Sequence, residues 1–313
     1  MKAKKIFLII IVAILSACGS YPAYRYYTDL QEAKKQQVLI EKRKVAWKVL
    51  RQKLINEISQ FNGEAGIVVK DLQTNWEIVH NKDKLFPSAS LAKIPIMSAC
   101  FFAAEEGRLK LDRNVALKSS DKLFGSGILK DTRPGATFTV EELIGLMIYD
   151  SDNTATNILT NLIGIDYLCN AFNSFGLKNT NLSRRVVDFS SRDRGIENYT
   201  TAEDMALILE QMYRRSLVNK NVSEKCLKLL KLQRVNDRIP KYLPVDVTVA
   251  HKTGLERSAC HDVAIVFSCK GDFLICVLTK HANSNSAPSK EFIAKVALHT
   301  YAYFEQSREG GLR

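Results

Sequence analysis

Residues 86–97 read Phe86-Pro87-Ser88-Ala89-Ser90-Leu91-Ala92-Lys93-Ile94-Pro95-Ile96-Met97, a serine and a lysine three apart beside an apolar segment. On a helix such residues share one face, so we expect the Lys93 ammonium beside the Ser90 hydroxyl. Serine is a weak nucleophile unless a base, or an amine of lowered pKa, takes its proton. Pro95 disfavours an unbroken helix. Unpaired N–H groups at the helix start would suit an oxyanion at Ser90. The stretch predicts a nucleophilic serine with its base.

Two further motifs distinguish this pair from a second Ser-x-x-Lys sequence. That second copy, Ser119 to Lys122, lies in a polar run that is typical of a solvated loop. Downstream of Ser90 follow Ser151-Asp152-Asn153 and then Lys252-Thr253-Gly254, each of which occurs once. Three unrelated surface tripeptides would seldom have this order and spacing, so we interpret the three motifs as one site.

The pattern of apolar residues predicts strands near both ends of the chain and helices between them. Ser/Thr capping signals open helices after Thr139 and Thr201. This order predicts an α+β fold, in which an antiparallel sheet built from both ends of the chain packs against a helical subdomain. The expected strands are 65–70, 76–80, 247–252, 263–269 and 273–279, and a last helix covers 290–304.

The first residues predict an export signal. Lys2, Lys4 and Lys5 precede an apolar segment, 6–15, that is short for a permanent membrane span. Leu15-Ser16-Ala17-Cys18-Gly19 then resembles a bacterial lipobox. The resemblance implies cleavage before Cys18 and lipidation of that cysteine, which would anchor the protein to a membrane. An ordinary signal peptide or an uncleaved anchor are the alternatives.

We therefore expect four parts: a signal peptide (1–17), a lipidated tether and basic helical stalk (18–44), a catalytic domain (45–306) and a tail (307–313). The tether would extend from residue 21 to about 29. The following helix has a rough 3.6-residue apolar period and ends at Asn62-Gly63. About 260 residues suffice for one compact domain with a sizeable core.

Composition narrows the partners. The net charge of +12 would suit nucleic acid, but the basic residues are spread along the chain, no nucleic-acid motif occurs, and export argues against it. An anionic lipid or wall polymer is the expected electrostatic partner. Apart from Cys18, six cysteines lack Cys-x-x-Cys spacing and are expected to be mostly small buried side chains, with no assignable disulfide. The five histidines form no ligand pattern, so we expect neither metal nor cofactor.

The three motifs resemble those of the class A β-lactamase branch of the penicillin-recognising serine acyl-enzymes, over nearly the whole domain. The resemblance implies a β-lactamase/transpeptidase-like fold. It implies that Ser90 attacks the lactam carbonyl and that Lys93 takes or relays the proton. Ser151 would pass a proton to the leaving nitrogen, and Asn153 would hold Lys93 and the substrate side-chain amide.

The same resemblance assigns the substrate-binding side of the site. Lys252 and Thr253 would bind the substrate carboxylate from an edge strand, beside Gly254. The backbone N–H groups of Ser90 and Leu255 would form the oxyanion hole. Arg238 resembles an arginine that some members bring beside the lysine, where its guanidinium would suit a carboxylate; alternatively it is a surface arginine before a turn.

One loop departs from the family pattern. The family has an Ω-shaped loop reading Arg-x-Glu-x-x-Leu-Asn, whose glutamate activates the water that hydrolyses the acyl-enzyme. Here residues 184–190 place Arg184 at the arginine, Val186 at the glutamate and Ser190 at the asparagine. Asp188 is the candidate substitute base. Competence as a β-lactamase therefore depends on a residue other than the family's glutamate.

Three functions follow from this pattern. The first is a β-lactamase-like hydrolase that forms an acyl-enzyme at Ser90. The second is a penicillin-binding peptidase or transferase acting on D-Ala-D-Ala ends of peptidoglycan. The third is a non-catalytic lipoprotein that binds wall peptides, against which the intact catalytic set argues. In each case we expect a monomer in the cell envelope, anchored by lipid and facing the periplasm or the exterior.

Overall fold

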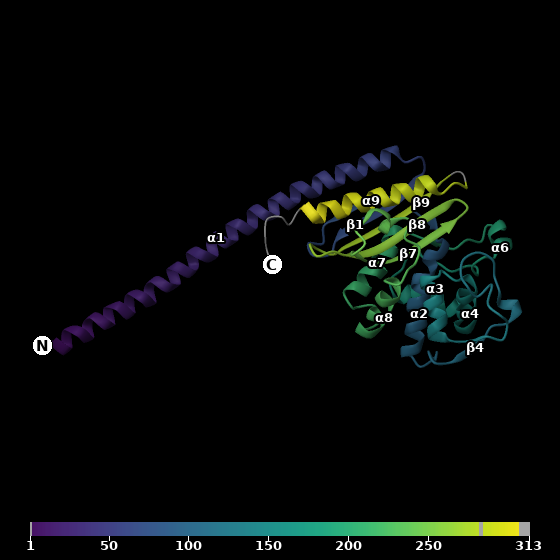
Figure 1. The fold of residues 1–313 in the computed structure, drawn as a ribbon, viewed down its shortest axis with the longest axis horizontal. Helices are drawn as coiled ribbons and strands as arrows, with labels where there is room; N and C mark the ends of the chain where they lie inside the picture. The colour runs from purple at the N-terminus through teal and green to yellow at the C-terminus, as the bar shows by residue number, and fades with distance from the viewer. Residues whose placement is uncertain (1, 282–283, 307–313) are drawn as a thin grey trace.

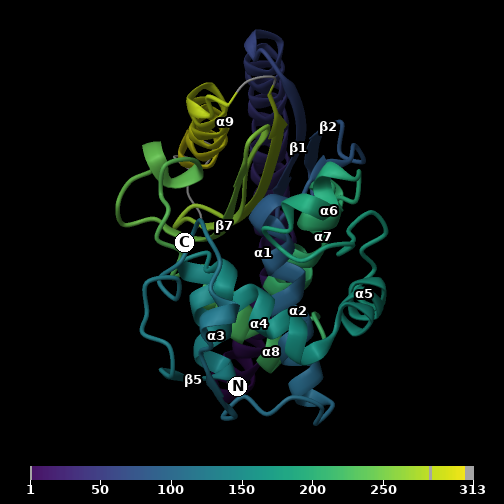
Figure 2. The ribbon, with the colours of Figure 1, turned by 90° about the vertical axis from the view of Figure 1, so that its right-hand side faces the viewer.

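The computed structural model describes residues 2–281 and 284–306, with side chains from residue 24 onward. Its centre is a five-stranded antiparallel sheet with the strand order β2-β1-β9-β8-β7 (Figures 1 and 2). Strands β1 (Glu64–Asp71) and β2 (Glu77–His80) come from the start of the domain. Strands β7 (Thr248–Glu256), β8 (Ala259–Phe267) and β9 (Phe273–Lys280) come from its end. The predicted α+β class and the sheet built from both ends of the chain are confirmed.

The central pairing joins strands far apart in sequence. β1 pairs with β9 along its whole length, from Glu64 opposite Lys280 to Asp71 opposite Phe273. The predicted strand 247–252 was too short, because β7 continues to pair with β8 as far as Glu256 opposite Ala259. The complete Lys252-Thr253-Gly254 motif therefore lies within an edge strand.

Both faces of the sheet are covered, so its strands alternate between two apolar cores. Helices α1 (Lys2–Gln60) and α9 (Ala287–Gln306) lie side by side over one face (Figure 1). A helical subdomain covers the other face (Figure 2). Along β9, the two cores receive alternate side chains: Phe273, Ile275 and Val277 on the α1 side, and Leu274, Cys276 and Leu278 on the other.

The helical subdomain encloses α2 (Lys93–Glu105), whose first nine residues are all buried. Pro95 is the third residue of α2, where the N–H that proline lacks would have no partner within the helix, so the helix is not broken. Thr139 and Thr201 cap their helices by accepting hydrogen bonds from the N–H groups of Glu142 and Asp204, as predicted. Around α2 pack α3 (Val140–Tyr149), α4 (Asn153–Ile163), α5 (Ile165–Ser174) and α8 (Lys220–Leu230), of which α5 and α8 were not predicted. Helix α7 (Ala202–Tyr213) packs between α8 and the sheet.

Short elements connect these layers. Two small ribbons are formed by β3 (Phe86–Pro87) with β6 (Tyr199–Thr200), and by β4 (Asn114–Ala116) with β5 (Thr137–Thr139). The remaining turns are the 3-10 helices η1 (Ala89–Ala92), η2 (Ser119–Asp121) and η3 (Ile239–Tyr242), and the five-residue helix α6 (Phe189–Asp193).

Helix α1 extends from the domain as a long rod (Figure 1). The tether expected near residues 21–29 is helical instead; residues 24–60 contain neither glycine nor proline, so nothing there interrupts the helix. Arg43 Nη2 lies 2.8 Å from the buried Asp71 carboxylate, so contact with the domain begins slightly before residue 45. The side chains of the signal peptide and Cys18, and the tail 307–313, lie outside the described residues. No helix in the described part of the chain has the length and apolarity to cross a membrane.

Candidate active site

The nucleophile segment is fixed at both sides before α2 begins. Ser90 lies in the η1 turn directly before α2, after Ala89, whose φ is +45°. The Ser88 N–H donates to the Asn198 carbonyl at 2.7 Å, and the His261 side chain bridges Pro87 O (2.8 Å) and the Thr279 N–H (3.1 Å). Burial lowers the pKa of His261 to about 4, so the ring is neutral at pH 7, donating to Pro87 and accepting from Thr279. These contacts hold the Ser90 turn against the sheet.

Two lysines meet at the Ser151 side chain. Lys93 Nζ lies 3.1 Å from Ser151 Oγ, 2.6 Å from Ser151 O and 2.8 Å from Asn153 Oδ1. Lys252 Nζ lies 3.0 Å from the same Ser151 Oγ. The structure thus brings all three motifs together. Within the described residues, however, the Ser90 hydroxyl has no hydrogen-bond partner, so the direct contact with Lys93 expected from helical spacing is not made.

The middle residue of the Ser-Asp-Asn motif is structural. Asp152 accepts hydrogen bonds from the N–H of Ala155, which caps α4, and from the N–H of Leu129. Asn153 donates to the carbonyl of Phe124 at 3.0 Å. The motif therefore docks the loop before residue 130 onto the site while it positions Ser151.

The two lysines are buried without a carboxylate in contact. Desolvation by burial lowers the pKa of Lys93 to about 7, although the negative charge of Asp152 opposes the shift. Burial, followed by the charge of Lys93, lowers the pKa of Lys252 well below its usual value. An amine with a pKa near neutrality is partly unprotonated at pH 7 and able to accept a proton.

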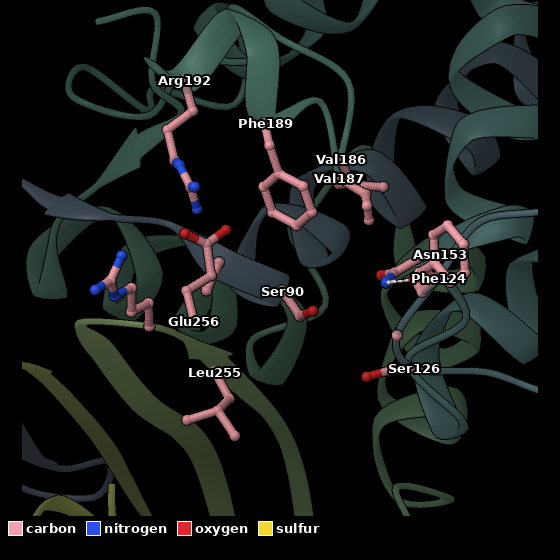
Figure 3. A pocket seen from close by; sticks show the side chains of 13 residues that line it. Ser90, Phe124, Ser126, Asn153, Val186, Val187, Phe189, Arg192, Leu255 and Glu256 are labelled. Carbon is pink, nitrogen blue, oxygen red and sulfur yellow. Dashed lines mark hydrogen bonds between the residues drawn. The ribbon is translucent and has the colours of Figure 1, made fainter. Parts of the chain in front are cut away.

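A cavity of about 450 Å³ opens in front of Ser90 (Figure 3). The Ser90 side chain points into it, between the end of β7 and Asn153 at the start of α4. Its walls are largely apolar, and one carboxylate, that of Glu256, reaches it. The lining residues are Ala89, Ser90, Phe124, Gly125, Ser126, Asn153, Val186, Val187, Phe189, Arg192, Leu255, Glu256 and Arg257.

Strand β7 approaches the nucleophile turn closely at Gly254. A Cβ atom there would lie 3.2–3.3 Å from atoms of His261, Ala89 and Leu91, tighter than ordinary side-chain contacts. The glycine therefore lets the strand reach the Ser90 turn, and Leu255 follows it at the cavity wall. Lys252 and Thr253, earlier in the strand, are buried and are not among the residues that line the cavity.

Arg238 is buried, which excludes the alternative that it is a surface arginine before a turn. It is 2% exposed, and its Nε lies 3.2 Å from Cys260 Sγ. Its charge contributes to the lowered pKa of Lys252, after the larger effects of burial and Lys93. It does not line the Ser90 cavity, and its effect on Lys252 is through its charge.

The loop between α5 and α7 brings Val186, but not Asp188, into the cavity. Arg184 anchors this loop through Glu197, with Nη2 at 2.6 Å from Oε1, and Asn157 holds both the N–H and the carbonyl of Val186. The Asp188 carboxylate instead accepts hydrogen bonds from the N–H and hydroxyl of Ser191 and caps α6, which lowers its pKa. The structure therefore gives no contact that supports Asp188 as the substitute base.

Sequence reasoning missed several wall residues. Phe124, Gly125, Ser126 and Glu256 were not singled out. The position of Glu256, two residues after Gly254 on the edge strand, was the available signal. Among the described residues, no cluster of histidine, cysteine and acidic side chains is arranged to hold a metal, and the six cysteines that the structure describes are unpaired.

A sequence profile described as the β-lactamase enzyme family matches residues 49–304. The chain belongs to this family. Its relatives include β-lactamase VEB-1 of Pseudomonas aeruginosa, which is 24% identical over 273 residues covering 82% of this chain and 90% of that protein. These similarities place it with the class A β-lactamases and related penicillin-recognising serine enzymes.

Solved structures show the same β-lactamase/transpeptidase-like fold. A β-lactamase of Sphaerobacter thermophilus superposes with a TM-score of 0.75 at 26% identity, covering 83% of this chain and 98% of that one. A point mutant of PBP-A, determined as an acyl-enzyme complex with penicillin G, superposes with a TM-score of 0.75 at 27% identity. The match covers 83% of this chain and 97% of that one. The structural neighbours of this chain thus include both β-lactamases and a protein that penicillin acylates.

Proposed function

We propose that this protein is a serine acyl-enzyme that reacts covalently with β-lactams through Ser90. The observation that carries the proposal is the buried Lys93, whose Nζ lies 3.1 Å from Ser151 Oγ and whose pKa burial lowers to about 7. Lys252 reaches the same hydroxyl at 3.0 Å, so one proton relay links the three motifs. This relay adjoins a cavity into which Ser90 points.

In the proposed reaction, Ser90 Oγ adds to the lactam carbonyl carbon and its proton passes to the neutral amine of Lys93. The oxyanion is held by the N–H groups of Ser90 and Leu255. The C–N bond then breaks, and the nitrogen takes a proton from Ser151, which recovers one from a lysine. Asn153 holds Lys93 and the substrate's side-chain amide, Thr253 and Lys252 bind its carboxylate, and the positive charge of Arg238 acts on Lys252. The product is an ester on Ser90.

Turnover of that ester is expected to be slow. Valine at position 186 cannot accept a proton, so the family's loop base is missing. This observation favours a second candidate function, a penicillin-binding peptidase or transferase that acts on peptidoglycan peptides and traps β-lactams. The similarity to PBP-A supports this second function, since a point mutant of PBP-A forms an acyl-enzyme with penicillin G. A wall-binding protein without catalysis is the third candidate, and the complete lysine–serine relay argues against it.

The location belongs to the proposal as well. A lipid on Cys18 would anchor the protein to a membrane of the cell envelope, facing the periplasm or the exterior, where β-lactams and wall peptides are met. The basis is the lipobox-like sequence around Cys18.

The test of acylation is labelling with a fluorescent penicillin. We expect the wild-type protein to be labelled and Ser90→Ala to be unlabelled. Ser119→Ala is the matched control, because Ser119 begins the second Ser-x-x-Lys sequence and is exposed in the η2 turn; its labelling should equal that of the wild type. Label on Ser90→Ala, or none on the wild type, would contradict the proposal.

A further inference from the structure

The cavity in front of Ser90 contains one side chain that is suited to accept a proton from water. Of its lining residues, the ionisable ones are Glu256, Arg192 and Arg257. Arginine stays protonated in proteins, so it cannot serve as a base. The Glu256 carboxylate is the remaining candidate, and the loop position 186 that faces the same cavity is a valine.

The strand geometry directs Glu256 into the cavity. Glu256 is the last residue of β7 and follows Leu255, and successive side chains of a strand point to opposite faces. Figure 3 shows this alternation: the Leu255 and Glu256 side chains, which both line the cavity, point in opposite directions, and the Glu256 carboxylate points toward Phe189 and Arg192. The Glu256 side chain is 27% exposed, so it is partly shielded from bulk water but open to the cavity.

The ion pair of Glu256 is weak and leaves one of its oxygens free. Arg184 Nη2 lies 3.4 Å from Glu256 Oε1, but 2.6 Å from Glu197 Oε1, so Glu197 is the arginine's main partner. Glu256 Oε2 accepts no hydrogen bond from the part of the chain that the structure describes. Burial, and next the negative charge of Glu197, raise the pKa of Glu256, whereas Arg184 and Arg192 oppose this shift. A carboxylate with a raised pKa is a stronger base than an ordinary glutamate.

We infer that Glu256 is the general base that activates water for hydrolysis of the Ser90 ester, from the edge strand rather than from the loop that holds Val186. The inference rests on the proposed acyl-enzyme function. It assigns a base to hydrolysis of the ester, for which Val186 provides none.

The Glu256 carboxylate takes one proton from a water molecule as the water oxygen bonds to the ester carbonyl carbon. The resulting oxyanion is stabilised by the N–H groups of Ser90 and Leu255. When the carbonyl re-forms, the bond from carbon to Ser90 Oγ breaks, and Oγ takes the proton held by Glu256. The products are a free carboxylic acid and the original serine.

A structural role for Glu256 makes different predictions. Through Arg184, Glu256 connects β7 with the anchored loop, so its loss would disturb the loop in the way that loss of Glu197 does. Glu197→Gln is therefore the matched control, because Glu197 has the closer contact with Arg184 but does not line the cavity.

The experiment uses the full chain acylated with penicillin G and freed of excess drug, with intact mass followed over time between pH 5 and 9. We expect Glu256→Gln to slow loss of the adduct by about 10²–10⁴-fold, while the acylation rate changes only a few-fold. In the wild type the rate of adduct loss should rise with pH as Glu256 ionises, and Glu256→Gln should lack this pH-dependent rise. Glu197→Gln should retain the pH-dependent rise but shift its midpoint to lower pH, because the substitution removes a negative charge and frees Arg184 to pair with Glu256.

Three results would overturn the inference. The first is that the wild type and Glu256→Gln have equal adduct lifetimes and pH profiles. The second is a wild-type adduct that is never lost. Either result would contradict the role of Glu256 and leave the proposed acylation intact. No adduct on the wild type would contradict the proposed function and remove the basis of the inference with it. If Glu256→Gln does not fold, Glu256→Asp and the midpoint shift in Glu197→Gln provide the test; an unmoved midpoint contradicts the inference.

Discussion

At the scale of single residues, the proposed acylation depends on a buried lysine in its uncharged form. Lys93 is fully enclosed, and its Nζ is surrounded by the oxygens of Ser151 and Asn153 rather than by a carboxylate. Hydrogen bonds from these neutral groups orient the amine but do not offset the cost of burying an ammonium ion. The site therefore favours the neutral amine, which is the form able to take a proton from serine.

We predict that acylation follows the ionisation of Lys93. With a pKa of about 7, the neutral fraction grows tenfold per pH unit on the acid side and levels off above pH 7. The second-order rate constant for labelling by a fluorescent penicillin should show this shape in stopped-flow measurements. Lys93→Arg should remove acylation, because arginine keeps its proton. A rate independent of pH between 5 and 8 would contradict the assignment.

The same shift links Lys93 to stability. Because its pKa is lower in the folded state than in the unfolded chain, the unfolded chain binds more protons between about pH 7 and the ordinary lysine value. This group's contribution to the free energy of unfolding therefore rises as pH increases through that window. Burial of the site's base thus reduces stability at neutral pH.

At the scale of elements, helix α1 has one part that projects and one part that completes the domain. Its C-terminal turns contribute Trp47, Leu50 and Leu54 to the core between the sheet and α9. Residues 24–46 are mainly exposed. The helix therefore belongs to the fold only where one face meets the sheet.

A pair of neighbouring substitutions in α1 should separate these surfaces. Leu54 is 0% exposed and Ile55 is 45% exposed. We expect Leu54→Ala to lower the free energy of unfolding by about 2–5 kcal/mol, since it leaves a cavity in the core. Ile55→Ala should change it by no more than about 0.5 kcal/mol. Urea denaturation measures both; equal effects would show that α1 does not pack as described.

At the scale of the whole molecule, the rod formed by α1 would separate the catalytic domain from a lipid anchor. From residue 18 to residue 45 a continuous helix at 1.5 Å per residue spans roughly 40 Å. If Cys18 carries the lipid, as we propose, this length would hold the Ser90 cavity away from the membrane surface. That placement suits a substrate in the wall.

We predict that a radiolabelled fatty acid is incorporated into the wild-type protein in the bacterial cell and not into Cys18→Ala. The wild type should partition into the detergent phase on phase separation, because acyl chains bury apolar surface in the micelle. Cys269→Ala is a suitable control, since Cys269 is also a free cysteine but exposed on the domain. Equal lipid incorporation in the wild type and Cys18→Ala would rule out this anchor.

The fold class and the family could be predicted from the amino-acid sequence, and so could the three motifs that the structure brings together. Strands have a local two-residue period and helix caps have local signals, so both can be recognised without the fold; the caps at Thr139 and Thr201 are examples. The three motifs were recognisable for the same reason, because each is a short run of consecutive residues. That they form one site was predicted from their order and spacing, and the structure adds that Lys93 and Lys252 both contact Ser151 Oγ.

Which side chains reach the cavity could be learned only from the packing of the folded chain. Asp188 is two residues from Val186 in sequence, yet it caps α6 instead of facing Ser90. Arg238 precedes a turn, yet it is buried, and its charge acts on Lys252. Glu256 becomes part of the site because β7 pairs with β8 beyond the predicted end of the strand and approaches the nucleophile turn at Gly254. These outcomes depend on contacts between segments far apart in the chain, which no local pattern of residues specifies.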